Sequence, residues 1–339
     1  MNITYILPSF YLCGGNRIAI EHCNGLAKRG HNVGIICING KFDKDWIHIE
    51  ENIEIVYSSE VRKTDWCKKS EAVVCTYFQT FYDMFGYEDV FQNAKLYYFV
   101  QQLEDRFFGN GPGKQQAINT YLKSKQKDVK IITEANWIKE KLKELYDLDA
   151  CHVPLCQELP SNIKKISFKT KKPIVLVEGN AEAPAKGVQD AWEAVKDIDC
   201  YKVLLTNSKE EFVPKNFVFD KMFCNVPWEQ ALSVIKSCDV LVKPSYFEGS
   251  PTPPMEAWEL GTAVVITNCT GWNEFGIDNM NCKVVDIADV EAMNKAILEL
   301  IEDKRETNRL IENGFVTAKT KFVGWDKSID LLDKLFSNR

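Results

Sequence analysis

Two glutamates, Glu248 and Glu256, stand eight residues apart at the two ends of a proline-rich loop. Carboxylates in this arrangement could accept hydrogen bonds from the hydroxyl groups of a ligand, or stabilise positive charge that develops during a reaction. The same residues also fit ordinary helix chemistry. Pro253 and Pro254 favour the first positions of a helix, with Thr252 predicted as its N-cap. Glu256 then falls in the first turn, where a negative charge complements the helix dipole.

A glycine pair forms a second candidate site near the start of the chain. The segment "CGGNR" (13–17) follows a predicted strand and opens a predicted helix. The backbone at Gly15 can therefore approach a ligand at the positively polarised end of that helix. A tight strand-to-helix turn explains the glycines equally well. A dinucleotide site is disfavoured, because the pattern is not GxGxxG and the second predicted strand ends in "CING" without a carboxylate.

Composition excludes several classes of protein. The chain has 339 residues, a net charge of −6 and 45% hydrophobic residues. These values are typical of a soluble globular protein of two domains and argue against a nucleic-acid partner. No apolar run reaches the roughly 18 residues of a membrane span. The N-terminal apolar run is interpreted as a first strand, since it lacks the basic region and cleavage pattern of a signal peptide.

The spacing of cysteine, histidine and aspartate predicts no metal site. The twelve cysteines contain no CxxC pair, which favours free thiols in a reducing cytoplasm. The histidines show no ligand spacing. Three Asp-x-Asp pairs, which arise readily by chance in an acidic chain, are interpreted as solvated surface: Asp43/Asp45, Asp147/Asp149 and Asp197/Asp199.

The order of apolar runs predicts an α/β fold. Short β-branched or aromatic runs alternate with amphipathic helical stretches, as in parallel sheets covered by helices. The alternation lapses in a lysine-rich segment, residues 157–173, and then resumes. We therefore predict a Rossmann-like domain over residues 1–156, a linker over 157–173 and a second Rossmann-like domain over 174–323. Ligands of such folds usually bind in the cleft between the domains, at the carboxyl ends of the strands.

The residues around the two glutamates resemble a known family. "KPSYFEGSPTPPMEAWELGTAVVITNCTGWNE" (243–274) is similar to the donor-binding segment of retaining GT-B glycosyltransferases. Pro-Ser, Glu-Gly, Glu-Ala, Gly-x-x-Val-Val and Gly-x-x-Glu follow one another in the family order. "GGNRIAIEHCNGLAKRGHNV" resembles the family's N-terminal glycine motif, and residues 324–339 resemble the helix that crosses back to the first domain. The resemblance implies the GT-B fold, with two Rossmann-like domains facing an interdomain cleft.

The resemblance also implies roles for individual residues. Glu248 is expected to contact the transferred sugar and to stabilise positive charge at the transition state, and Glu256 to bind the ribose diol. The other expected donor-binding residues are Gly15, Gly179, Asn180, Lys186, Gly249, Ser250 and Thr252.

Two positions of the donor site depart from the family pattern. Asn180 stands where an arginine is usual, and Pro251, which has no N–H, replaces a glycine. Ser250 and Thr252 could compensate through their amides and hydroxyls, and Lys243 could supply the missing charge. The favoured interpretation of Lys243, however, is an ordinary lysine at the end of a strand.

The first domain lacks the histidine that many family members place near the transferred sugar. The loop "QQLED" offers Gln101, Gln102 and Glu104 instead. We assign Gln102 as the second catalytic residue, through a hydrogen bond to the sugar, with Glu104 as an alternative partner for the acceptor hydroxyl. A purely structural loop is the other interpretation.

The function implied is that of a retaining hexosyltransferase that needs neither metal nor cofactor. It would move sugar from a nucleoside-diphosphate sugar to a saccharide or lipid-linked saccharide, in cell-surface polysaccharide or glycolipid synthesis. We expect it in the cytoplasm, or peripherally at the inner face of the membrane if the lysines of 157–173 bind anionic headgroups; a solvated linker explains them too. The alternative is a non-catalytic GT-B protein that binds a nucleotide sugar or glycan, or serves as a partner subunit. A sugar-nucleotide epimerase fits the glutamate pattern less well.

Overall fold

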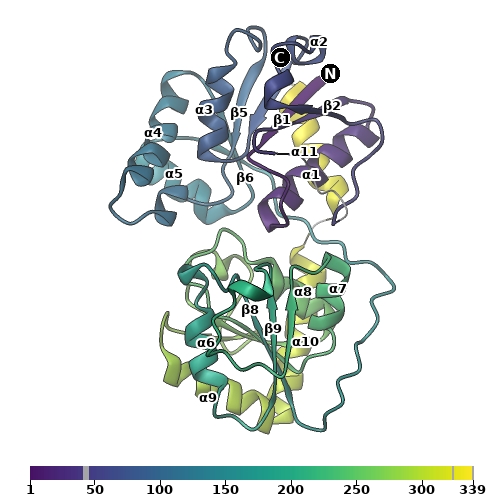
Figure 1. Cartoon of the computed structure of the whole chain (residues 1–339), viewed down its shortest axis with the longest axis vertical. Coiled ribbons are helices and arrows are strands. Elements are labelled where there is room, and N and C mark those ends of the chain that lie inside the picture. Colours follow the sequence, from purple (N-terminus) through teal and green to yellow (C-terminus); the bar gives the residue numbers. More distant parts are fainter. Residues whose placement is uncertain (41–45, 323, 338–339) are drawn as a thin grey trace. The chain divides into compact units, whose positions relative to one another are not determined.

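A computed structural model describes residues 1–40, 46–322 and 324–337, and Figure 1 shows the course of the chain. The chain divides into two compact units, each with its own sheet and core. The N-terminal unit consists of Met1–Cys156 and Gly324–Arg339, and the C-terminal unit of Gln157–Val323.

The N-terminal unit is built on a parallel sheet with the strand order β3-β2-β1-β4-β5-β6-β7. The strands form from the predicted β-branched and aromatic runs, with the short β7 as an addition at the edge. They are β1 (Asn2–Leu7), β2 (Asn32–Cys37), β3 (Glu54–Tyr57), β4 (Ala72–Cys75), β5 (Lys95–Phe99), β6 (Lys130–Thr133) and β7 (Ala150–His152). The α-helices are α1 (Gly14–Lys28), α2 (Asp65–Lys68), α3 (Phe78–Gly86), α4 (Pro112–Gln126), α5 (Asn136–Tyr146) and α11 (Trp325–Ser337).

Helices cover both faces of this sheet (Figure 1). Apolar side chains of α3, α4 and α5 pack on alternate strand residues of one face and form a continuous core. On the other face lies α1, with α11 packed against it. A Cβ at Gly25 would lie 2.4 Å from Ile329 Cγ1, so the missing side chain is what lets these two helices approach closely. The last helix of the chain therefore packs on the first.

The C-terminal unit repeats this architecture, with the strand order β10-β9-β8-β11-β12-β13. Its strands are β8 (Ile174–Glu178), β9 (Tyr201–Thr206), β10 (Lys221–Cys224), β11 (Val240–Lys243), β12 (Ala263–Thr267) and β13 (Lys283–Val285). Its α-helices are α6 (Val188–Val195), α7 (Trp228–Ile235), α8 (Thr252–Leu260), α9 (Val290–Glu302) and α10 (Lys304–Lys321). The helices α6 and α9 lie together on one side of the sheet, and α7 and α8 on the other (Figure 1). The predicted α/β fold is thus confirmed.

The start of α8 differs from the sequence prediction. The helix begins at Thr252, so its N-cap is Pro251, and Thr252 occupies the first helical position. A side-chain cap would bond the N–H of the second or third helical residue, but these are Pro253 and Pro254, which have none. A proline can therefore serve as N-cap, because no capping hydrogen bond to these two residues is lost. Glu256 consequently lies in the second turn, where the helix dipole does not account for its position.

Candidate active site

Four alternating charges form a connected chain at the carboxyl edge of the C-terminal sheet, in the order Glu178, Lys243, Glu248 and Lys186; we call them the charge chain. Lys186 Nζ donates to both carboxylate oxygens of Glu248 at 2.8 Å. Lys243 Nζ lies 3.1 Å from Glu248 Oε1 and 2.5 Å from Glu178 Oε2. The Ser245 hydroxyl donates to Glu248 Oε1 at 2.6 Å. Glu248 is therefore held by three side chains.

Burial differs along the charge chain. The exposed fractions of the side chains are 5% for Lys243, 13% for Glu248, 18% for Glu178 and 30% for Lys186. Burial raises the pKa of Glu248, but the attraction of Lys186 and Lys243 outweighs it and lowers that pKa to about 2. Burial lowers the pKa of Lys243, yet Glu178 and Glu248 raise it above its ordinary value. Both groups are therefore charged at neutral pH, and Lys186 is the member of the chain that a dissolved anion reaches most easily.

Strand register explains how Glu178 and Lys243, which we call the inner pair, come together. Because Val177 pairs with Val242 in the parallel ladder, the next residues, Glu178 and Lys243, end neighbouring strands side by side. The sequence prediction did not identify Glu178 as a site residue. The available signal was a charged residue at the end of each of two apolar runs, "IVLVE" and "VLVK". Lys243 is not a solvated strand-end lysine, because its ammonium group is buried between two carboxylates.

The loop that carries Glu248 is fixed to the loop between β8 and α6. Gly187 has φ +62°, and a Cβ there would lie 2.1 Å from the carbonyl oxygen of Pro244. Only glycine fits this close approach. The Tyr246 N–H donates to the Ala185 carbonyl at 2.8 Å, and this bond fixes Lys186 opposite Glu248.

A second loop, after β12, fixes the other side of Glu248. The backbone N–H of Glu248 donates to the Thr270 carbonyl at 3.2 Å, and the Thr270 hydroxyl donates to the backbone carbonyl of Glu248 at 2.9 Å. The next residue, Gly271, has φ +80°, and a Cβ there would lie 2.2 Å from the carbonyl oxygen of Gly249. The carboxylate is thus positioned by backbone contacts on both sides of its loop.

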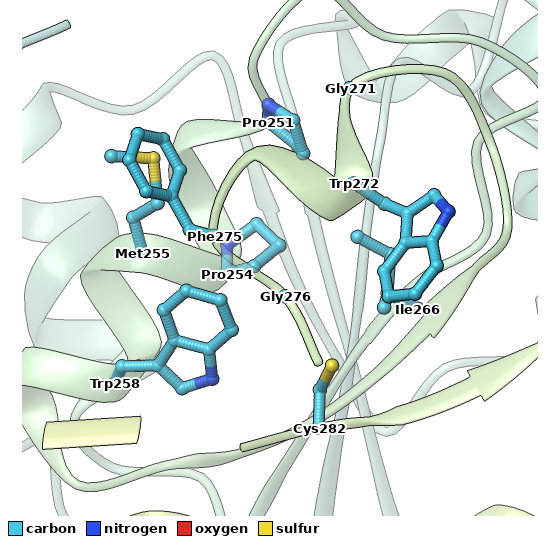
Figure 2. Close-up of a pocket in the computed structure, with 10 residues that line it drawn as sticks. All are labelled: Pro251, Pro254, Met255, Trp258, Ile266, Gly271, Trp272, Phe275, Gly276 and Cys282. Atoms are coloured by element: carbon cyan, nitrogen blue, oxygen red, sulfur yellow. The ribbon is translucent and has the colours of Figure 1, made fainter. Parts of the chain in front are cut away.

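Apolar side chains of α8 pack against this second loop and support it. Figure 2 shows Pro254, Met255 and Trp258 of α8 together with Trp272 and Phe275 of the loop around a small cavity. The cavity holds about 10 Å³, which is at most one water molecule, and its lining offers few polar partners. It is therefore a packing defect in a rigid support and no ligand site.

Glu256 projects from α8 and is only 4% exposed. Trp228 Nε1 donates to its Oε1 at 2.7 Å, which fixes the orientation of the carboxylate. Ser250, in the loop before α8, has a buried hydroxyl oxygen without a hydrogen-bond partner in the described part of the chain. A buried polar atom of this kind calls for a ligand or water. Thr252 follows as the first residue of α8.

The loop after β8 contains the predicted donor residues Gly179 and Asn180. Asn180 Oδ1 accepts hydrogen bonds from the Glu182 N–H at 2.8 Å and from the Ser208 hydroxyl at 2.9 Å. A Cβ at Gly179 would lie 2.9 Å from Val188 Cγ2. In this structure Asn180 therefore organises its own loop and supplies no charge, so the lysines are the cations of the site.

The remaining predicted residues, Gly15 and Gln102, belong to the N-terminal unit. Gly15 is the second residue of α1, and a Cβ there would lie 3.1 Å from Gln101 Oε1. Gln101, and not Gln102, thus lies against the glycine loop. Gln102 is 6% exposed, and its Oε1 accepts a hydrogen bond from the Leu103 N–H at 2.8 Å. Its catalytic role stays a prediction.

Glu104 requires a correction. Its Oε2 accepts hydrogen bonds from the Phe78 N–H and the Tyr98 hydroxyl, both at 2.6 Å, and the residue is 2% exposed. Burial raises its pKa to about 8 in spite of these bonds. The alternative in which Glu104 contacts an acceptor hydroxyl is wrong, because this carboxyl group fixes the start of α3 inside the core.

The Asp-x-Asp pairs lie on the surface where the structure describes them. Asp147 forms ion pairs with Lys125 and Lys143, and Asp199 with Lys172. Asp43 and Asp45 lie outside the described residues. Elsewhere along the described chain, no group of three or more His, Cys, Asp or Glu residues is placed to hold a metal ion. Nor does that part of the chain include a helix of the length and apolarity needed to cross a membrane.

The charge chain predicts a pH-dependent stability. The pKa of Glu248 is about 2 in the folded protein, against an ordinary 4.5. A carboxyl group with a depressed pKa contributes stability that is complete above its ordinary pKa and is lost as the pH falls through the folded value. The difference corresponds to about 3 kcal/mol. In urea denaturation, we expect the free-energy gap between the parent protein and Glu248→Gln to shrink by about this amount between pH 5 and pH 2. A gap that stays constant over this range would contradict the assignment.

Comparison with known proteins identifies a family model and related sequences. Residues 220–316 match the family model described as "Glycosyl transferases group 1". The uncharacterized glycosyltransferase MJ1178 of Methanocaldococcus jannaschii is 30% identical over 162 residues, which cover 46% of each chain. The lipopolysaccharide core biosynthesis glycosyltransferase LpsE of Rhizobium meliloti is 34% identical over 88 residues, 26% of each chain. The chain thus spans less than half the length of these curated relatives.

Solved structures extend the likeness to the whole fold. Anabaena Alr3699/HepE, in complex with UDP-glucose, superposes with a TM-score of 0.75 at 13% identity, covering 99% of each chain. At this identity the likeness establishes the fold alone. That fold is the GT-B fold of glycosyltransferases.

Proposed function

We propose that this chain is a retaining hexosyltransferase of the group 1 glycosyl transferases; the match of residues 220–316 to that family's model and the GT-B fold support the proposal. It moves a sugar from a nucleoside-diphosphate sugar to a saccharide or lipid-linked saccharide acceptor. The observation that carries the proposal is Glu248, an ionised carboxylate held between Lys186 and Lys243 at the carboxyl edge of the C-terminal sheet. Ligands of α/β proteins bind at this edge.

The reaction requires that positive charge on the sugar and negative charge on the diphosphate be stabilised together. As the bond from the sugar to the phosphate breaks, the sugar ring becomes oxocarbenium-like and the leaving diphosphate gains charge. Glu248 supplies a fixed negative charge for the sugar and accepts hydrogen bonds from its hydroxyls. In a retaining front-face reaction the departing phosphate takes the proton of the acceptor hydroxyl, so the protein need not supply a base.

Lys186 is the residue that we assign to the diphosphate. It has the most exposed side chain of the charge chain, at 30%, and its ammonium group pairs with Glu248, in the loop that leads to Ser250 and α8. Pro253 and Pro254 remove two amide donors from the start of α8. Phosphate binding therefore depends more on side chains, namely Lys186 and the hydroxyl of Ser250, which has no hydrogen-bond partner among the described residues.

Glu256 is assigned to the ribose. The indole N–H of Trp228 holds its Oε1, which orients the carboxylate on a rigid helix before any ligand binds. A carboxylate so oriented can accept bonds from both hydroxyls of a ribose diol. In the N-terminal unit, Gly15 is assigned to donor binding and Gln102 to a hydrogen bond with the transferred sugar, as the resemblance implies.

The relatives suggest where to look for substrates. LpsE is named for lipopolysaccharide core synthesis, and HepE was solved with UDP-glucose. We therefore propose a role in cell-surface polysaccharide or glycolipid synthesis and test uridine diphosphate sugars first. A lipid-linked acceptor would bring the enzyme to the inner face of the membrane, where the lysines of residues 157–173 could meet anionic headgroups.

Nucleoside diphosphates should raise the melting temperature in a dye-based thermal scan. At a hundred times its dissociation constant, a ligand that binds only the folded protein adds about 2.7 kcal/mol of stability. We expect Glu256→Ala to lose this response. Glu259→Ala provides a matched control, because Glu259 lies on the same helix and forms an ion pair with Lys319 away from the charge chain. No response to UDP, GDP, TDP or ADP from the parent protein would refute a donor site.

A second assay separates the enzyme from a non-catalytic binding protein. Asn180 and Pro251 lack the charge and the amide usual at their positions, which is the observation that favours the binding protein. Nucleotide release from a panel of nucleotide sugars, with mixed saccharide acceptors, is expected from the enzyme. Binding without release across the panel would favour the binding protein.

A further inference from the structure

Lys243 is a buried cation that the proposed reaction does not use. Its side chain is 5% exposed and lies between the carboxylates of Glu178 and Glu248. Burying a charged group is costly unless it is paired, and both partners here are themselves mostly buried. No donor in solution can reach this ammonium group as it can reach Lys186, so Lys243 is poorly placed to bind phosphate directly.

Donor binding must disturb the charge chain. In the absence of a donor, Lys186 Nζ bonds both oxygens of Glu248 at 2.8 Å. A diphosphate that binds Lys186 competes with Glu248 for the same three ammonium protons. If no second cation stayed beside Glu248, the buried carboxylate would take up a proton or move once Lys186 bound the diphosphate, and either change would remove the negative charge from the reacting sugar.

Lys243 prevents this loss of negative charge if it stays paired with Glu248 while Lys186 binds the diphosphate. Glu178 anchors it from the neighbouring strand, with 2.5 Å between Lys243 Nζ and Glu178 Oε2. The Ser245 hydroxyl adds a neutral hydrogen bond to the same Glu248 oxygen. Resting on the proposed function, we propose that Lys243 is a positioning residue that keeps Glu248 in place and negatively charged while the donor diphosphate occupies Lys186.

Few other groups could take this role. In the described part of the chain, the groups that face Glu248 are Lys186 from the turn before α6, Lys243 from β11, Ser245 from its own loop, and Thr270 and Cys269 from the loop after β12. Burial raises the pKa of Cys269 to about 12, so its thiol is neutral. Lys243 is therefore the cation among these groups that stays with Glu248 after Lys186 has turned to the donor.

The test is the pH dependence of turnover in Lys243→Met. We expect kcat at neutral pH to fall at least about tenfold. The acid limb of the kcat profile should move up by about 1 to 3 pH units, because Glu248 then takes up its proton more easily. The KM for the donor should change little. Lys186→Met, by contrast, should mainly raise the donor KM.

Lys283→Met is the matched control. Lys283 is also a buried lysine of the C-terminal unit, with a side chain 10% exposed and two carboxylate partners, Glu299 and Glu306. Its replacement should lower stability but leave kcat and the acid limb unchanged. If Lys243→Met does not fold, the double variant Glu178→Gln/Lys243→Met removes both buried charges of the inner pair. It should show the same loss of kcat and the same shifted acid limb.

Each other result overturns the inference. An unchanged kcat and acid limb in Lys243→Met, or in the double variant, makes Lys243 a purely structural residue. A raised donor KM with normal kcat makes it a phosphate ligand. If the parent protein turns over none of the nucleotide sugars, the proposed function itself fails and the inference falls with it.

Discussion

Glu248→Gln is expected to lower the rate of sugar transfer by about 10²- to 10³-fold, the effect of removing one preorganised electrostatic contact at a transition state. Glutamine keeps the shape of the side chain but not the negative charge that the developing oxocarbenium ion requires. Nucleotide binding should persist or become tighter, because Lys186 no longer shares its protons with a carboxylate. Initial rates of nucleotide release, together with calorimetric titration by UDP, separate the two effects.

Glu259→Gln serves as the control for this comparison, since it removes the charge of another α8 carboxylate that is mostly buried, at 11% exposure, and that pairs with Lys319 outside the charge chain. It should leave both the rate and the affinity near those of the parent. Two outcomes would refute the role of Glu248. One is a Glu248→Gln enzyme with a rate within twofold of the parent, and the other is a parallel loss of nucleotide binding.

Gly271→Ala is expected to destabilise the C-terminal unit and to disable the site at the same time. An alanine at φ +80° costs about 1–2 kcal/mol in backbone strain. In addition, its Cβ would lie 2.2 Å from the Gly249 carbonyl oxygen, which is backbone and cannot rotate away. The loops that fix Glu248 must therefore move apart. A displacement of about 1 Å at a reacting centre can lower the rate about 10²-fold.

Gly261→Ala isolates the contribution of the strain. Gly261 ends α8 in the same unit with φ +77°, but a Cβ there would meet nothing within 4 Å. We expect this variant to lose about 1–2 kcal/mol in urea denaturation and to keep its activity. If Gly271→Ala matches it in both stability and rate, the close contact with Gly249 does not position Glu248.

Other positions show the limits of prediction from sequence. Gln101 and Gln102 are adjacent and chemically identical, so only the course of the backbone in the loop after β5 decides which one lies against Gly15 and which is buried with its Oε1 on the Leu103 N–H. Glu104 has the chemistry of a catalytic carboxylate, yet the hydroxyl of Tyr98 and the start of α3 hold it in the core.

The amino-acid sequence by itself determined the alternation of strands and helices, the resemblance around Glu248 and Glu256, and hence the α/β fold, because apolar periodicity and turn residues act over short stretches of chain. Only the tertiary structure decided the surroundings of Glu248. Glu178 and Lys243 are 65 residues apart and meet because β8 and β11 are neighbours in the sheet. Which charges share a buried site depends on strand order and register, and these arise from the packing of the whole unit, which local sequence patterns do not contain.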